Sequence, residues 1–260
     1  MDTNLKGFHA FITGGSDGFG FEMAKTLLSH GATVVIAARG GVKLDKAYTN
    51  LKAEWTDVYA IGMDVRDEGS VADAAEWYDA NLDRLDMLVN NAGIGMRGVN
   101  KRFPDDPAPF YTIEPSAFYN VVATNFIGYF LVARAFVPLM VRHRKGRVVT
   151  VSTGIKTMTA PGQLPYGPAR AGAEAMSVIM SKELNDLGIM VNVLLPGGAA
   201  STGFATEEER ANGPKHGLLP ADILNEAILF LASEKAEGMT GERIIAKEFH
   251  QWLEEKGISL

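Results

Sequence analysis

FHAFITGGSDGFG, from Phe8 to Gly20, is the stretch that decides the fold of this chain. An apolar run typical of a buried strand leads into a glycine-rich turn, and a helical pattern begins inside the turn. Glycines let the backbone turn tightly and let a bulky phosphate group approach without a Cβ in the way. The free N–H groups at the start of a helix suit a pyrophosphate. A glycine-rich string alone is weak evidence, but between a strand and a helix it favours a dinucleotide site over an ordinary turn.

The composition limits the classes of protein that the chain can belong to. It has 260 residues, 47% hydrophobic, a net charge of −6 and no cysteine. The negative charge argues against nucleic acid as a partner. The absence of cysteine excludes disulfides, a thiolate nucleophile and cysteine-type zinc sites, and it fits a reducing cytoplasm. No apolar run approaches the roughly 20 residues of a membrane span, and no signal peptide is evident, so we expect a soluble cytoplasmic protein.

Short apolar runs alternate with longer helical patterns along the whole chain. Strands are expected at Phe8–Ile12, Thr33–Ala38, Val58–Ile61, Met87–Val89, Arg147–Val151, Met190–Leu195 and Arg243–Ala246. Helices are expected near Gly20–Ser29, Lys43–Glu54, Ser70–Asn81, Pro115–Arg142, Tyr166–Asp186 and Ala221–Ser233. Apolar runs without alternation suit strands covered on both faces. We therefore expect one α/β domain over residues 1–260, with a doubly wound, seven-stranded parallel sheet and helices on both faces.

Two segments are predicted to be long loops after strands. One is Gly93–Pro115, which holds four prolines, and the other is Gly197–Pro220, rich in Gly, Ala and Glu. Loops this long in a compact domain are often lids or binding loops, so we interpret both as candidate substrate loops, with plain surface loops as the alternative. They contain Arg97, Lys101, Arg102, Phe110, Tyr111 and Phe204, which makes an acidic or aromatic substrate conceivable.

The end of the second strand bears on the choice of coenzyme. In a dinucleotide fold this end faces the adenosine ribose, where an acidic residue takes the 2′-hydroxyl of NAD and an arginine accommodates the 2′-phosphate of NADP. Arg39 stands there and favours NADP. Asp17, in the glycine turn, is an anion that could repel the extra phosphate, so NAD remains open.

Polar residues follow the later strands in an ordered series. Asp64 and Val65 follow the third strand, and Asn90–Gly93 follow the fourth. Paired asparagines at a strand end indicate a structural hydrogen-bond hub, because a buried amide is costly unless it is satisfied. Tyr166 and Arg170 are four residues apart on a predicted helix, so both side chains can share one face. The histidines have no second ligand at metal spacing, and we expect no metal site.

With these motifs in the same order, the chain resembles the short-chain dehydrogenase/reductase superfamily, in its single-domain branch of about 250 residues. The match runs from the first strand to the last, and the residues that carry it lie between the first strand and the end of the sixth. They are Thr13–Gly20, Asp64, Asn90–Gly93, Asn125, Thr153, Tyr166 and Pro196-Gly197.

The resemblance implies a role for each matching position. Tyr166 would be the general acid or base, Thr153 would stand where the family has a serine that contacts the substrate oxygen, and Asn125 would support a water chain. The coenzyme-binding residues would be Gly14, Ser16, Gly18, Phe19 and Gly20 at the pyrophosphate, Asp64 and Val65 at the adenine, Asn91, Ala92 and Gly93 at the ribose, and Pro196, Gly197 and Ala199 at the nicotinamide. The family also implies a homo-oligomer, a dimer or a tetramer.

The chain departs from the family pattern at Arg170, where the family has lysine. That lysine binds the nicotinamide ribose and lowers the pKa of the tyrosine by its charge. Arginine keeps the charge and has more donors, but it is longer and does not release a proton at accessible pH. Two hypotheses follow. The first is an NAD(P)-dependent oxidoreductase that interconverts a secondary alcohol and a ketone on a small molecule. The second is a catalytically weak or silent relative that acts as a nucleotide sensor or scaffold.

Overall fold

Seven parallel strands form the centre of the molecule. The structure is a computed structural model that describes residues 3–204 and 217–260. The strands are β1 (His9–Thr13), β2 (Thr33–Ala38), β3 (Val58–Gly62), β4 (Met87–Asn90), β5 (Gly146–Val151), β6 (Ile189–Leu195) and β7 (Arg243–Ile245). Their order in the sheet is β3-β2-β1-β4-β5-β6-β7, and every neighbouring pair is parallel. The predicted seven-stranded Rossmann-type sheet is therefore confirmed.

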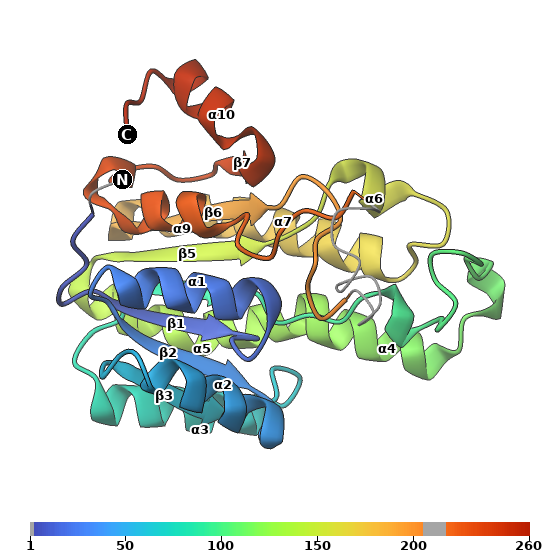
Figure 1. Cartoon of the computed structure of the whole chain (residues 1–260), viewed down its shortest axis with the longest axis horizontal. Helices are drawn as coiled ribbons and strands as arrows, with labels where there is room; N and C mark the ends of the chain where they lie inside the picture. Colours follow the sequence, from blue (N-terminus) through green and yellow to red (C-terminus); the bar gives the residue numbers. More distant parts are fainter. Residues whose placement is uncertain (1–2, 205–216) are drawn as a thin grey trace.

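Helices cover both faces of the sheet (Figure 1). They are α1 (Gly18–Ser29), α2 (Val42–Lys52), α3 (Glu68–Asn81), α4 (Pro115–Val122), α5 (Gly128–His143), α6 (Ile155–Thr159), α7 (Tyr166–Glu183), α9 (Asn225–Ala232) and α10 (Phe249–Lys256). Apolar residues of α1, α2, α9 and α10 pack in one core, and those of α3, α5 and α7 pack in the other. The chain adds strands in one direction from β1 to β3 and in the other direction from β4 to β7. The loops after β1 and β4 therefore meet at the carboxyl edge, at the switch point where such folds bind ligands.

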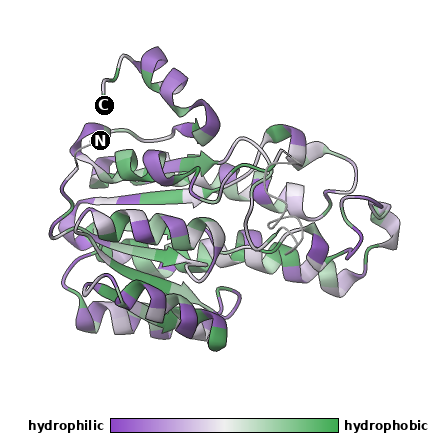
Figure 2. Cartoon of the chain, viewed as in Figure 1, coloured by the Kyte–Doolittle hydropathy of each residue, from purple (hydrophilic) through white to green (hydrophobic). Residues whose placement is uncertain are grey.

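Each strand contributes side chains to the two cores alternately, because successive side chains point to opposite faces of the sheet. In β1, Ala10 and Ile12 belong to the core under α1, whereas Phe11 belongs to the core under α5. Figure 2 shows the strands as largely hydrophobic and the helices as banded with hydrophilic residues on their outer sides. Burial on both faces explains why the strand sequences read as continuous apolar runs rather than alternating ones.

Two elements differ from those predicted. The predicted helix Pro115–Arg142 is divided by a π turn, Ala123–Ile127, between α4 and α5. The chain after β7, for which no helix was predicted, forms α10, because Phe249 and Trp252 pack on Phe230 of α9 with ring centroids 5.6 and 5.8 Å away. Aromatic packing from another element thus stabilises a helix too short to be marked by its own periodicity.

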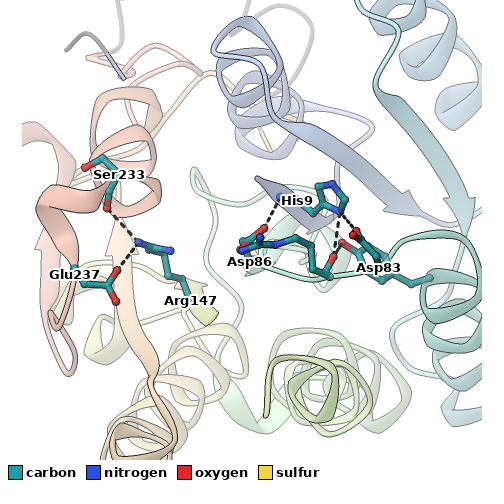
Figure 3. Close-up of polar contacts among 8 residues, drawn as sticks. His9, Asp83, Asp86, Arg147, Ser233 and Glu237 are labelled. Carbon is teal, nitrogen blue, oxygen red and sulfur yellow. Dashed lines mark hydrogen bonds and ion pairs between the residues drawn. The ribbon is translucent and has the colours of Figure 1, made fainter. Parts of the chain in front are cut away.

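The amino edge of the sheet is held by buried ionic groups. Figure 3 shows Arg147 of β5 reaching Glu237, 3.0 Å from its Nη2, and the carbonyl of Ser233, 3.3 Å away. Asp86, only 2% exposed, accepts the backbone N–H of His9 at 2.8 Å and hydrogen bonds from the Arg84 side chain. These contacts join strands and loops at the end of the sheet opposite the glycine turn, so they are structural.

One helical segment of the described residues, Pro115–His143, is long and apolar enough to cross a membrane by length and composition alone. Its most apolar window has a mean hydropathy of 1.5, and 44% of that window is buried inside the molecule. Core helices pass the same test. The segment includes α5, whose Val132, Phe136 and Met140 are fully buried against the sheet.

Phe136 is expected to be among the costliest residues to truncate. Its ring lies 4.2 Å from that of Phe11 and 5.9 Å from that of Tyr78, with no exposed surface. Phe136→Ala should lower the free energy of unfolding by about 3–5 kcal/mol, since it removes apolar contacts and leaves a cavity. Urea denaturation measures this. Phe110→Ala, whose ring is 70% exposed, is the matched control and should change it by less than about 0.5 kcal/mol.

Candidate active site

The glycine turn is fixed against the neighbouring strand end. Gly14 has φ +67°, its N–H donates to the carbonyl of Ala37 at 2.7 Å, and a Cβ there would lie 2.9 Å from the Cα of Ala92. Only glycine fits this backbone conformation and this approach without strain. The predicted phosphate residues Ser16, Gly18, Phe19 and Gly20 follow, at the start of α1.

Asp17 caps α1 and is paired with a cation. Its Oδ1 accepts the N–H of Gly18 at 2.8 Å, and its Oδ2 lies 2.7 Å from Nζ of Lys43. Lys43 is the second residue of α2 and follows the exposed Arg39 by four residues. Two cations, Arg39 and Lys43, therefore stand near the end of β2. Lys43 offsets the negative charge of Asp17, which was the reason to expect weaker binding of NADP.

Thr13 and Asn91 lock the ends of β1 and β4 together. The Thr13 hydroxyl accepts the N–H groups of Asn91 and Ala92 at 2.9 and 3.0 Å and donates to the carbonyl of Val89 at 3.2 Å. The Asn91 amide donates to the carbonyl of Thr13 at 2.9 Å, and that of Asn90 donates to the carbonyl of Tyr129 at 3.2 Å. The asparagine pair thus makes the predicted hydrogen-bond hub.

Asp64, after β3, is held by Arg66. The Arg66 guanidinium donates to both carboxylate oxygens, with Nη2 2.5 Å from Oδ2 and Nε 2.9 Å from Oδ1. This pairing lowers the pKa of Asp64 below its usual range, so the group stays ionised. Val65 is buried and its side chain packs on the backbone of Gly128. The two residues border the carboxyl edge next to β2.

Asn125 lies in the π turn between α4 and α5. Its Oδ1 accepts the N–H of Ile94 at 3.0 Å, and its Nδ2 donates to the carbonyl of Ile94 at 2.8 Å. Both ends of the amide are thereby bonded to the loop after β4, two residues beyond Ala92. A π turn inside a helix often marks a functional site, and here it aims the amide at that loop. The water chain expected at Asn125 stays a prediction.

Tyr166 and Arg170 converge, as their i, i+4 spacing predicts. Both are on α7, and the guanidinium carbon of Arg170 lies 5.4 Å from the centre of the Tyr166 ring. Arg170 is 3% exposed, and a Cβ at Gly93 would collide with its Nη2. The cation is therefore buried between the tyrosine and the loop after β4.

Tyr129, which we did not expect in the site, contacts Arg170 from the other side. Its ring centre lies 5.2 Å from the guanidinium carbon, and its hydroxyl accepts a hydrogen bond from Nη1 of Arg170. The same Nη1 donates to the carbonyl of Val151, the last residue of β5, at 2.8 Å. One signal was available in the sequence, since Tyr129 follows Asn125 by four residues and shares its helix face.

Thr153 follows β5 and is half-buried, and its carbonyl accepts a hydrogen bond of 2.8 Å from Nη2 of Arg243. Arg243 also donates to Glu174 of α7 at 2.9 Å, so it ties the end of β5 to the tyrosine helix. The hydroxyl of Ser152 is buried without a partner among the described residues. Of the two neighbours, Thr153 has the more accessible side chain, as expected from strand alternation.

The two predicted substrate loops meet at Phe204. Its ring lies 6.2 Å from the Tyr166 ring, edge-on, and its carbonyl accepts a hydrogen bond of 2.7 Å from Arg97. A Cβ at Gly95 would lie 3.0 Å from the Phe204 ring. Phe110 and Tyr111, in contrast, are exposed and stand 70% and 78% open to solvent. Residues 205–216 of the second loop lie outside the described residues.

The remaining predicted residues after β6 divide by burial. Pro196 is buried and its carbonyl accepts the N–H of Lys247 at 3.2 Å, whereas Gly197 and Ala199 are exposed. Most of the predicted positions follow the carboxyl ends of strands or lie at the start of a helix, whereas Asn125 lies in the π turn between α4 and α5 and Arg170 lies one turn into α7. No group of three His, Cys, Asp or Glu residues in the described ranges could hold a metal ion.

Comparison with known proteins finds a matching family and relatives that agree with one another. A sequence family described as "short chain dehydrogenase" matches residues 8–213. A 3-oxoacyl-[acyl-carrier-protein] reductase of Salmonella typhimurium is 30% identical over 249 residues, which cover 93% of this chain and 96% of the relative. A gluconate 5-dehydrogenase of Gluconobacter oxydans is 28% identical over 204 residues, 78% of this chain and 74% of the relative.

Among solved structures, a 3-ketoacyl-(acyl-carrier-protein) reductase of Brucella melitensis complexed with NADH superimposes with a TM-score of 0.80. Its sequence is 27% identical, and the match covers 93% of this chain and 97% of that one. The fold and the family of the relatives agree with the resemblance that the motifs carry.

Gly93 tests how tightly the site is built. In Gly93→Ala the new Cβ would meet Nη2 of Arg170 and lie 2.7 Å from Oδ1 of Asn125, so one or both of these buried side chains must shift. We expect the free energy of unfolding to fall by about 1–3 kcal/mol, measured in urea. Gly98→Ala, in the same loop with open space around it, should leave that energy unchanged. Equal effects of the two substitutions would show that the packing around Arg170 is loose.

Proposed function

The chain belongs to the short chain dehydrogenase family, and on this premise we propose that it is an NAD(P)-dependent oxidoreductase that interconverts a secondary alcohol and a ketone. The observation that carries the proposal is the placement of Tyr166 and Arg170. A phenol and a buried cation stand together at the carboxyl edge of the sheet, one turn of helix apart.

The residues present fit a dinucleotide. The glycine turn lies at a helix start, and Gly14 approaches Ala92 so closely that a Cβ on the turn would not fit there. We assign the pyrophosphate to Gly14, Ser16, Gly18, Phe19 and Gly20, the adenine to Asp64 and Val65, and the ribose to Asn91, Ala92 and Gly93. The nicotinamide would lie against Pro196, Gly197 and Ala199, with Tyr166 and Arg170 beside its ribose.

The coenzyme, when bound, supplies or accepts the hydride. In the reducing direction the Tyr166 hydroxyl donates its proton to the substrate oxygen, and in the oxidising direction it accepts that proton. The Thr153 hydroxyl donates a hydrogen bond to the same oxygen. Arg170 provides fixed positive charge beside the Tyr166 ring. Asn125 holds the loop after β4 through Ile94, and we keep it as the support of a water chain.

NADP is the coenzyme that we propose as preferred, with NAD as the alternative. Arg39 is exposed at the end of β2, where a 2′-phosphate would stand. Lys43 adds a second cation and pairs with Asp17, so the carboxylate in the turn opposes the phosphate less than its charge alone suggests. The solved relative with NADH shows that its own site takes the other coenzyme.

The partners that we propose are a small carbonyl or alcohol compound and further copies of the chain, with no nucleic acid or membrane, in the cytoplasm. A homo-oligomer, dimer or tetramer, is supported by apolar side chains exposed on the helices that carry the site. Tyr119, Ile127 and Phe130 lie on α4, the π turn and α5, and Val178 and Ile179 lie on α7, each 45–70% exposed. The single domain of residues 1–260 and the two substrate loops also remain proposals.

A nucleotide sensor or scaffold without turnover is the second candidate. The observation that favours it is that Nη1 of Arg170 is bonded to Tyr129 and Val151 inside the core, so both of its hydrogens are already used by the protein. Tyr166→Phe separates the two candidates, because only an enzyme needs the proton of that phenol.

Tyr166→Phe should lower the rate of ketone reduction at least about 100-fold, since proton transfer by a positioned group contributes this much or more. The measurement is NADPH absorbance with a panel that includes a 3-oxoacyl ester and 5-ketogluconate. NADPH affinity should stay within about threefold, because the ring remains. Tyr119→Phe, on an exposed phenol, is the control and should keep full activity. A wild-type chain that binds NADPH but turns over none of the panel supports the sensor.

Arg39→Ala should weaken NADPH binding by about 10–100-fold and leave NADH binding nearly unchanged, because a charge-assisted contact to the 2′-phosphate is lost. Fluorescence titration with both coenzymes measures the ratio. Lys52→Ala removes a cation from the far end of α2, where it donates to the carbonyl of Thr56, and should alter neither affinity. Equal losses for both coenzymes in Arg39→Ala would overturn the preference for NADP.

A further inference from the structure

Tyr129 is a buried phenol that the proposed mechanism does not use. It lies in the first turn of α5 and is 1% exposed. Its hydroxyl accepts a hydrogen bond from Nη1 of Arg170 and donates to the carbonyl of Val151 at 3.3 Å. Burying a phenol this deeply is costly unless its hydroxyl both donates and accepts a hydrogen bond. Here both hydrogen-bond partners belong to the site.

The contacts of Arg170 divide its nitrogens into two groups. Nη1 carries two hydrogens, and Tyr129 and Val151 accept both of them, the latter at 2.8 Å. Nη2 is directed towards Gly93, where a Cβ would collide with it, and Nε has no hydrogen-bond partner among the described residues. The three hydrogens on Nη2 and Nε are therefore not used in the contacts with Tyr129 and Val151.

The two phenol rings also fix the plane of the cation. The guanidinium carbon lies 5.2 Å from the centre of the Tyr129 ring and 5.4 Å from that of the Tyr166 ring. Both distances are within the range of a cation–π interaction, which a planar guanidinium makes with aromatic faces. An ammonium group has neither the plane nor the fork to make these contacts together with two hydrogen bonds to Tyr129 and Val151.

Burial and mutual contacts keep Tyr129 and Arg170 each in one protonation state. It raises the pKa of Tyr129, because the phenolate form would lose its water, so the residue stays a neutral phenol. Burial alone would lower the pKa of Arg170, but its contacts with Tyr129 and Tyr166 raise it above the ordinary value, so the guanidinium stays charged. The titratable groups that act on Arg170 are these two phenols, on α5 and α7.

We propose that Tyr129 is a positioning residue that anchors Nη1 of Arg170 in the core and thereby turns Nε and Nη2 towards Tyr166 and the loop after β4. This inference rests on the proposed function of the site. Arginine at position 170 and tyrosine at position 129 then form one unit. Tyr129 acts only through the guanidinium, and it has nothing to act on when that guanidinium is absent.

A double-mutant cycle tests this dependence with Tyr129→Phe, Arg170→Lys and the double variant. Tyr129→Phe in the wild-type background should lower kcat/KM about tenfold, because the guanidinium loses one anchor. In the Arg170→Lys background the same change should lower it by less than about twofold. The expected coupling is thus at least about fivefold. Effects of Tyr129→Phe that are equal in both backgrounds would overturn the proposal.

Two readouts distinguish positioning from plain stability. In Tyr129→Phe the pH of half-maximal kcat/KM for alcohol oxidation should rise by about half a unit or more, because the cation is less well held beside Tyr166. Tyr78→Phe is the matched control. It removes another buried hydroxyl, bonded to the carbonyl of Arg84 at 2.9 Å, and should lower stability without moving the pH profile. A profile that is unchanged in Tyr129→Phe contradicts positioning.

A measurement on the free protein does not depend on turnover or on the folding of Tyr129→Phe. Nitrogen-15 labelled arginine should show the Nη1 protons of Arg170 protected from solvent exchange, with the signal identified by its loss in Arg170→Lys. Rapid exchange of those protons would overturn the anchor. If the wild-type chain turns over no substrate, the proposed function fails, while the protection and the coupling measured in NADPH affinity still decide whether Tyr129 holds Arg170.

Discussion

A guanidinium buried in the centre of a protein must have its charge and its donors satisfied, because removing an unpaired cation from water costs several kcal/mol. Arg170 meets most of this requirement with the hydroxyl of Tyr129, the carbonyl of Val151 and the faces of two phenol rings, while its Nε has no hydrogen-bond partner among the described residues. Those partners come from α5, β5 and α7. The position of one cation therefore depends on three elements being packed correctly, and the proposed active site is built around that cation.

The same dependence links the two halves of the sheet. Thr13 and Asn91 join the end of β1 to the end of β4, and Asn125 joins the loop after β4 to the π turn before α5. Gly93 lies between these contacts and Nη2 of Arg170, where a side chain has no room. The glycine turn and the Tyr166 helix, which are far apart in the chain, are thus connected across the carboxyl edge by these hydrogen bonds and by the close approach of Gly93 to Arg170.

Several features of the site were open to prediction because they follow from local rules. Strand and helix alternation placed the glycine turn at the carboxyl edge, and the i, i+4 spacing placed Tyr166 and Arg170 on one helix face. The pairing of Asp17 with Lys43 and the contact of Phe204 with Tyr166 were not predictable in this way. Each joins segments that meet only after crossovers, and no periodicity marks such a meeting.

The sequence by itself determined the class of fold, the family resemblance and the order of the site residues. The reason is that the fold class follows from the spacing of hydrophobic residues, and the resemblance follows from motifs at fixed intervals. Tertiary structure alone decided what surrounds Arg170. The exchange of lysine for arginine is visible in the sequence, but its partner Tyr129 is 41 residues away. Packing of α5 and α7 on the same face of the sheet brings the two residues together. The structural effect of having arginine in place of lysine therefore depends on contacts that cannot be recognised in the sequence.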